Sequence, residues 1–123
     1  MSQSQLYLNE YLLGNIIKRI FPDNEIIFNG QYSWLPSPRG GNLQLDIYIP
    51  ELNLGIEYNG KQHYSLTRKF HDDKKDFLYR KECDALKKKL CKKNGVKLII
   101  FTYREKLSYV SVVKKLKRTG VLS

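Results

Sequence analysis

Residues 43–59, LQLDIYIPELNLGIEYN, decide the fold because they contain two alternating segments joined by a turn. Residues 43–49 and 54–59 each predict a strand, and residues 50–53 predict the turn between them. Antiparallel pairing about that turn opposes only apolar residues on one face, so it predicts a single core face. The opposed pairs of this register are Ile49 with Leu54, Ile47 with Ile56, and Leu45 with Tyr58.

On the other face the same register opposes Asp46 to Glu57. Directly opposed residues have Cβ atoms about 5 Å apart, so the two carboxylates repel each other unless one is protonated or a cation lies between them. Mg²⁺ prefers oxygen ligands and often takes only one or two carboxylates. The alternative is a surface pair in a twisted hairpin whose acids point to solvent.

The other segments predict an α/β fold in one domain, residues 1–123, with the order α-β-β-β-α-β-α around a central mixed four-stranded sheet. Residues 5–20 have helical spacing with a broad apolar face that includes Leu8, Tyr11 and Leu12. The remaining predicted elements are a short strand at 25–28, a connection at 36–42, a helix at 72–93 capped by Asn94-Gly95, a strand at 96–103 and a helix at 106–118. The strand at 96–103 is so apolar that we expect it at the centre of the sheet, and Val110, Val113 and Leu116 predict the buried side of the last helix.

Charge is distributed unevenly along the chain. The net charge is +10, yet residues 1–60 hold three basic and six acidic groups, whereas residues 61–123 hold nineteen basic and six acidic groups. A solubilising lysine surface is the alternative, but the asymmetry favours a face that binds a polyanion such as nucleic acid.

Two other classes of protein are disfavoured. No apolar run approaches the roughly 18 residues that a membrane span needs, and the N-terminus lacks the basic region of a secretion signal. Cys83 and Cys91 lie about two helical turns apart, so we expect reduced thiols in a cytoplasmic protein. A zinc site that combines these cysteines with His63 and His71 lacks a C-x-x-C motif and is disfavoured.

Two strings resemble one family. Residues 45–64, LDIYIPELNLGIEYNGKQHY, and residues 84–99, DALKKKLCKKNGVKLI, resemble the PD-(D/E)xK nuclease superfamily, which is restriction-endonuclease-like. They are most similar to its small phage-type endonucleases, which are related to very short patch repair and EDxHD homing enzymes. The resemblance covers residues 45–103, and the first helix matches by its order alone.

The resemblance implies a role for each matching residue. Asp46 and Glu57 match the metal-binding acids, and the remaining catalytic matches are Gln62, His63, Asp84, Lys87 and, by helix position only, Glu10. The superfamily's lysine, two residues after the second acid, is replaced here by Asn59. Its role would then fall to His63, Lys61 or Lys87, and a neutral His63 suits a general base.

The expected function is a metal-dependent DNA endonuclease of phage or mobile-element type, which hydrolyses phosphodiester bonds with Mg²⁺, or with Mn²⁺ in its place. The alternative is a nucleic-acid-binding module that keeps the fold without cleaving, and the Asn59 departure favours it. Enzymes that cut both strands often pair two active sites, which leaves room for a homodimer. Phosphate contacts are expected from Lys61, Lys88, Lys89, Lys92 and Lys93. His71, Asp72 and Asp73 are assigned no chemistry, because the two acids suit a helix N-terminus.

Overall fold

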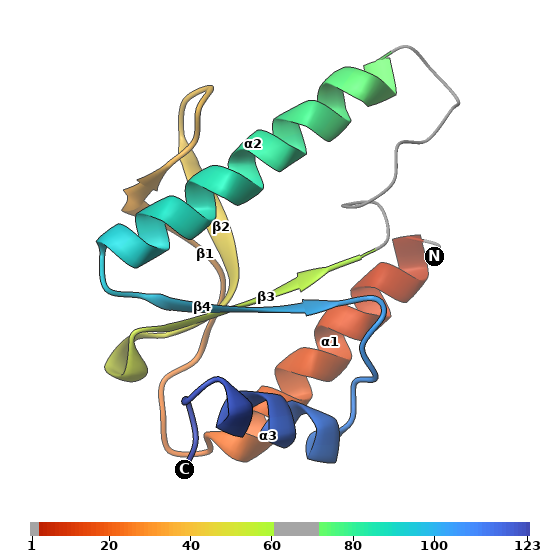
Figure 1. The fold of residues 1–123 in the computed structure, drawn as a ribbon, viewed down its shortest axis with the longest axis vertical. Coiled ribbons are helices and arrows are strands. Elements are labelled where there is room, and N and C mark those ends of the chain that lie inside the picture. The colour runs from red at the N-terminus through yellow and green to blue at the C-terminus, as the bar shows by residue number, and fades with distance from the viewer. Residues whose placement is uncertain (1–2, 61–71) are drawn as a thin grey trace.

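A four-stranded sheet lies between two helical layers (Figure 1). A computed structural model describes residues 3–60 and 72–123. Helix α2 runs across one side of the sheet, and α1 and α3 lie on the other side (Figure 1). In chain order the elements are α1 (Gln3–Ile20), β1 (Ile27–Pro36), β2 (Asn42–Ile49), the 3₁₀ turn η1 (Pro50–Leu52), β3 (Leu54–Asn59), α2 (Asp72–Lys93), β4 (Lys97–Thr102) and α3 (Tyr109–Arg118).

The predicted order of helices and strands and the mixed sheet are confirmed. The strands lie in the order β1-β2-β3-β4, with β3 and β4 parallel and the other neighbours antiparallel. The central position predicted for β4 is wrong, because within the described residues β4 pairs only with β3 and lies at the edge of the sheet. Its apolar sequence has another cause: Ile99 and Phe101 pack on the α1 side while Leu98 packs on the α2 side.

The first strand is longer than its sequence pattern predicted. The short strand expected at 25–28 is a ten-residue strand, β1, that continues to Pro36. Asn29 takes a left-handed conformation, with φ of 56°, so the alternation of the strand is interrupted where the prediction stopped. The expected connection at 36–42 is the turn between β1 and β2, and Arg39 in it stacks 3.8 Å from the centre of the Tyr79 ring on α2.

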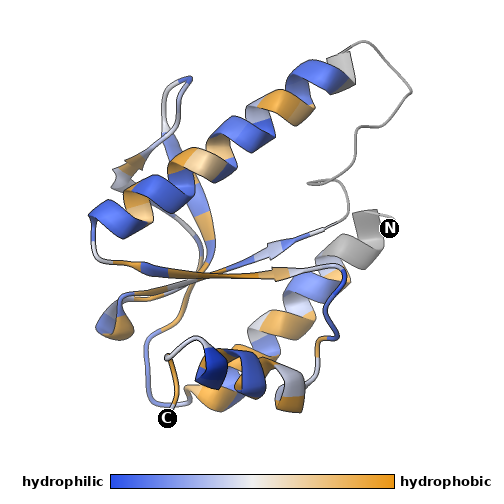
Figure 2. Cartoon of the chain, in the orientation of Figure 1, coloured by the Kyte–Doolittle hydropathy of each residue, from blue (hydrophilic) through white to orange (hydrophobic). Residues whose placement is uncertain are grey.

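Two hydrophobic cores hold the layers together. The larger core joins α1 and α3 to the sheet through residues such as Leu13, Ile17, Ile56 and Leu116. The smaller core lies on the α2 side and includes Leu35, Leu45, Cys91 and Val96. Figure 2 shows hydrophobic residues along much of β4 and hydrophilic residues along much of α2 and α3.

The predicted hairpin register is confirmed for three pairs: Ile47 with Ile56, Tyr48 with Gly55, and Ile49 with Leu54. The predicted pairing of Leu45 with Tyr58 on one core face is wrong. Leu45 packs in the smaller core, whereas Ile47 and Tyr58 pack in the larger one, on opposite sides of the sheet. The strict alternation of β2 is therefore broken between Leu45 and Ile47, at Asp46.

The helix ends follow the local sequence. Gly95, with φ of 72°, ends α2, and the Val96 amide donates to the Cys91 carbonyl at 2.8 Å, as the Asn94-Gly95 signal predicted. Ser108 caps α3 by accepting a hydrogen bond from the Ser111 amide at 3.2 Å.

Two predicted apolar helix faces are partly wrong. In α3 the buried residues are Val112 and Leu116, which are four residues apart and pack in the larger core, whereas Val110 lies off that face and is 60% exposed. In α1, Tyr11 is exposed because the buried stripe of that helix follows Leu13, Ile16 and Ile17 instead. In the described part of the chain, no helix has the length and apolar character to span a membrane.

Candidate active site

Asp46 and Glu57 lie together where the paired part of β2 and β3 ends. The Asp46 amide donates to Glu57 Oε2 at 2.6 Å, and the Tyr58 amide donates to Asp46 Oδ2 at 2.9 Å. Each carboxylate therefore accepts a hydrogen bond from the backbone of the neighbouring strand, where a continuing ladder would use carbonyl oxygens. This crossed arrangement fixes both acids on a rigid part of the sheet.

The alternative of two acids pointing to solvent does not describe this site. Glu57 is only 6% exposed, and Asp46 is half-buried. The ammonium group of Lys87, which comes from α2, forms an ion pair with Glu57 Oε1. Glu57 is therefore buried on the side of the sheet that faces α2, where it contacts Lys87. Asp46 borders the cavity on the α1 side of the sheet.

The electrostatics of Glu57 follow from this placement. Burial, followed by repulsion from Asp46, raises the pKa of the Glu57 carboxyl from 4.5 to about 7, although Lys87 and the Asp46 amide act in the opposite direction. Repulsion from Asp46 therefore acts on Glu57 in the direction expected for two opposed carboxylates. Burial, together with Glu57, also raises the pKa of the Cys91 thiol, to about 11.

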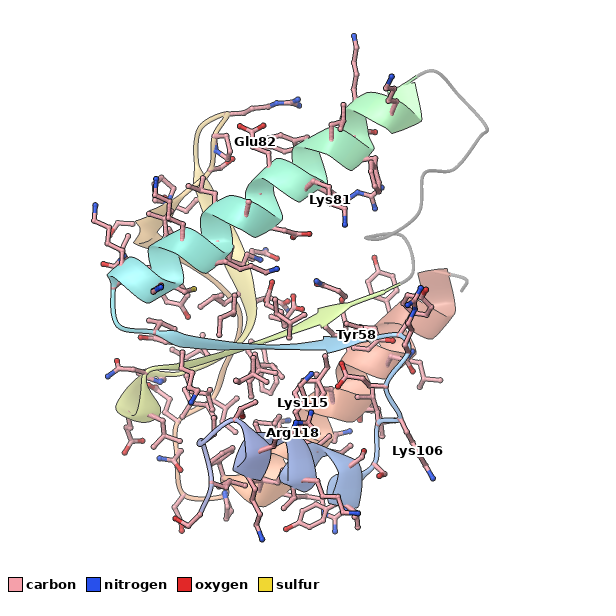
Figure 3. The ribbon with its side chains drawn as sticks, viewed as in Figure 1. Tyr58, Lys81, Glu82, Lys106, Lys115 and Arg118 are labelled. Carbon is pink, nitrogen blue, oxygen red and sulfur yellow. The ribbon has the colours of Figure 1, made fainter. Side chains whose placement is uncertain are left out.

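Glu10 lies in the same cavity as Asp46, although only its position in the first helix suggested a role. The cavity has a volume of about 300 Å³ and is lined by residues of α1, β1, β2 and the end of β3. Tyr58, labelled in Figure 3, forms part of its wall. The Asn9 side-chain amide donates a hydrogen bond to the Tyr58 hydroxyl at 2.9 Å. Glu10, Asp46 and Tyr58 thus border one cavity from three elements, α1, β2 and β3.

The other predicted site residues are distributed as follows. Asp84 lies one turn before Lys87 on the same side of α2, so those two are neighbours. Asn59, at the end of β3, is 8% exposed. Lys61, Gln62 and His63 lie outside the described residues, so their predicted roles stay predictions. The predicted phosphate-contacting residues of α2, Lys88, Lys89, Lys92 and Lys93, are all exposed.

Within residues 3–60 and 72–123, no three side chains of His, Cys, Asp or Glu come close enough together to hold an ion by themselves. Asp46 and Glu57 are a two-carboxylate arrangement, which is a donor set that Mg²⁺ accepts when water and phosphate complete its coordination. Cys91 is fully buried in the smaller core, so the disfavoured zinc site would need a ligand from the protein interior.

Sequence reasoning missed the aromatic lining of the cavity. Tyr7, Tyr11 and Phe28 border it, together with Tyr58, and the first three are between 40% and 70% exposed. A usable signal was present, because Tyr7 and Tyr11 are four residues apart on one side of α1 and Lys18 follows on the same side. The signal was overlooked because Tyr11 was counted among the core residues of the apolar face predicted for residues 5–20.

Comparison with known proteins finds viral relatives. The chain is 40% identical over 86 residues to uncharacterized protein 033L of Invertebrate iridescent virus 3, which is 68% of this chain and 44% of that protein. It is 42% identical over 82 residues to uncharacterized protein 307L of Invertebrate iridescent virus 6, and 40% identical over 68 residues to uncharacterized protein 094L of Frog virus 3.

The chain spans less than half the length of each of these relatives. Their names assign no activity. No protein-family model matches the chain, and no solved structure matches it. The viral source of these relatives is consistent in a broad sense with the expected phage or mobile-element type, while the nuclease resemblance stays an interpretation of the residues.

Proposed function

We propose that this chain is a metal-dependent endodeoxyribonuclease that hydrolyses phosphodiester bonds. The observation that carries the proposal is the crossed pair of Asp46 and Glu57, with Lys87 on Glu57. A buried acid beside a second acid is unfavourable for stability alone, since repulsion and desolvation both oppose its charge. Groups with such perturbed pKa values are concentrated at functional sites.

Asp46 and Glu57 are the residues that would hold Mg²⁺, or Mn²⁺ in its place. A carboxylate oxygen that accepts one hydrogen bond retains a second lone pair, so the backbone contacts leave both acids able to bind an ion. The bound ion would polarise the scissile phosphate and lower the pKa of a water molecule. The proposal assigns the ion no other part.

Lys87 is the residue proposed for the role that the superfamily gives to a lysine at the position of Asn59. Its ammonium group is already at the acid pair, whereas the Asn59 side chain carries no charge. A fixed cation there would offset negative charge that develops on the phosphoryl oxygens. Glu10 and Asp84 are proposed to orient the surrounding groups, and His63 and Gln62 keep their sequence-based assignment, with His63 as general base.

DNA is the proposed partner because the exposed lysines of α2 and the excess of basic groups after residue 60 suit a polyanion. A homodimer would supply the two active sites that double-strand cleavage needs. The host cytoplasm remains the proposed location.

One observation favours a non-catalytic nucleic-acid-binding module instead. The Glu57–Lys87 ion pair satisfies the buried acid without any metal, as a structural ion pair would. Under this alternative the acids hold β2 and β3 in place, and binding comes from the basic surface alone.

Plasmid cleavage separates the two functions. Supercoiled plasmid is incubated with the chain and Mg²⁺ or Mn²⁺, with and without chelator. We expect metal-dependent nicking that Asp46→Asn and Lys87→Met each reduce by at least about 10², the scale of losing a catalytic electrostatic contact. Glu82→Asn and Lys75→Met are the matched controls, since both residues are exposed on α2 and neither is an expected phosphate contact. Glu82 is labelled in Figure 3. Absence of metal-dependent cleavage on plasmid, single-stranded and branched DNA, with binding retained, would establish the binding module.

A further inference from the structure

The cavity beside Asp46 has the size of a site for one small planar group. Its volume of about 300 Å³ lies at the lower end of the range for small-molecule sites. It opens on the α1 side of the sheet, opposite the Lys87 side of Glu57. A group bound there would lie next to Asp46, which lines the cavity.

The walls of the cavity are unusually aromatic. Tyr58 is 3% exposed and is held by Asn9, so its ring forms a fixed inner wall. Tyr7 and Tyr11 are 59% and 70% exposed, and Phe28 is 40% exposed. Aromatic side chains at the surface of a strongly basic chain are typical of platforms on which bases of single-stranded nucleic acids stack.

Gly14 lets one aromatic ring of the cavity wall pack closely against α1. Gly14 lies in the interior of α1, where glycine is unfavourable for a helix relative to alanine. A Cβ at this position would lie 3.0 Å from Phe28 Cε1, so the missing side chain lets the Phe28 ring lie against the helix. Gly14 and Phe28 both line the cavity.

The polar groups of the cavity favour a base over a phosphate. Glu10 and Asp46 would repel a phosphate placed inside, whereas the amide groups of Asn15 and Asn29 suit the donors and acceptors of a base edge. Lys18 provides the cation, and its Nζ lies 5.2 Å from the centre of the Phe28 ring. A strand could therefore place its base in the cavity and a phosphate near Lys18.

We propose that this cavity binds one unstacked nucleobase of the strand that reaches Asp46, so that the preferred substrate contains unpaired nucleotides. The inference rests on the proposed function in taking nucleic acid as the ligand. It goes further by naming the substrate class: a single strand, flap or junction is bound through the cavity, and uninterrupted duplex is not.

Binding in chelator tests the inference without requiring cleavage. Fluorescence anisotropy is measured at one salt concentration for a short single-stranded oligonucleotide and for the matching blunt duplex. In further copies of the single strand, one nucleotide at a time is replaced by an abasic site. We expect one position to lose about 5- to 100-fold in affinity when its base is removed, which is the worth of one stacked base.

Tyr11→Ala should weaken binding of the intact single strand by a similar factor and should remove the sensitivity to the abasic position, with duplex binding changed less than about twofold. Tyr109→Ala is the control, because Tyr109 is an exposed tyrosine on α3 outside the cavity. Since Tyr11 is mostly exposed, its replacement should leave the melting temperature close to that of the parent chain.

Four outcomes overturn the inference: no binding of any oligonucleotide, no abasic-sensitive position, equal loss on duplex and single strand, or a Tyr11→Ala change confined to a shift from dimer to monomer in light scattering. The last would make the aromatic rim an interface between copies. Abasic sensitivity without metal-dependent cleavage would refute the proposed function and keep the base site. Metal-dependent cleavage without an abasic-sensitive position would support the proposed function and refute the base-binding site.

Discussion

Replacing the Glu57 carboxyl by an amide should remove a pH dependence of stability that this one group creates. The pKa of Glu57 is raised from 4.5 to about 7, so between those values the folded chain retains a proton that the unfolded chain releases. The stabilisation is therefore complete below about pH 4.5 and is lost as the pH rises through about 7. Glu57→Gln has no carboxyl to titrate and should lack this loss.

The magnitude follows from the shift. One pKa unit corresponds to about 1.4 kcal/mol, so the full loss is about 3 kcal/mol. For a chain of this size that corresponds to roughly 10 °C in the melting temperature. A protonated Glu57 and a glutamine are both neutral, so Glu57→Gln should start close to the stability of the parent chain at acidic pH and should then stay nearly constant as the pH rises.

The measurement is thermal unfolding by circular dichroism in chelator between about pH 5 and about pH 8. Glu82→Gln, an exposed amide substitution on α2, should keep the slope of the parent chain. The two histidines are common to all three proteins, so any contribution from them cancels in the comparison. Parallel slopes for the parent chain and Glu57→Gln would refute the assigned burial and repulsion at Glu57.

Three other predictions address the surface, the core and the chemistry. Lys88→Ala with Lys89→Ala should flatten the plot of log affinity for duplex DNA against log salt by up to about 2, and an unchanged slope would locate the phosphate contacts elsewhere. Tyr32→Phe should raise the free energy of unfolding by about 1 kcal/mol, because the buried Tyr32 hydroxyl has no hydrogen-bond partner among the described residues; a loss in chemical denaturation would contradict this. His63→Ala should slow cleavage by roughly 10²–10⁴ and remove the acidic limb of the pH–rate profile, whereas a limb that persists would belong to Glu57 or to metal-bound water.

The hairpin shows how far a sequence pattern can determine a site. Alternation gave the correct register between Ile47 and Ile56, and that register brought Asp46 next to Glu57. A prediction from alternation assumes that every second residue of a strand packs in the same core. In β2 this fails, because Leu45 packs in the core on the α2 side whereas Ile47 packs in the core on the α1 side. The crossed hydrogen bonds of the two acids use backbone groups, and no residue pattern reports which backbone groups a carboxylate will occupy.

Other features of the fold could not be predicted from the sequence because they depend on tertiary contacts. A strand that is apolar throughout must be covered on both faces, but coverage does not require a strand on both edges, as β4 shows. The approach of Lys87 to Glu57 depends on how α2 crosses the sheet, so the sequence could only name Lys87 as one of several cations. Tyr11 was predicted to lie on the apolar face of the first helix because tyrosine was counted as hydrophobic. One end of a tyrosine side chain is polar and tolerates solvent, and Tyr11 is exposed.

Because Cys91 is buried, the chain has one cysteine, Cys83, that should react preferentially with a labelling reagent. Thiol reagents attack the thiolate, and a fully buried thiol whose pKa is about 11 offers almost none at neutral pH. Cys83 is half-buried on α2, eight residues before Cys91, so a maleimide dye should attach there first. A single fluorophore on Cys83 would then report distances between α2 and a labelled oligonucleotide without any engineered cysteine. Reaction of a second thiol, Cys91, would show that the smaller core on the α2 side of the sheet had opened.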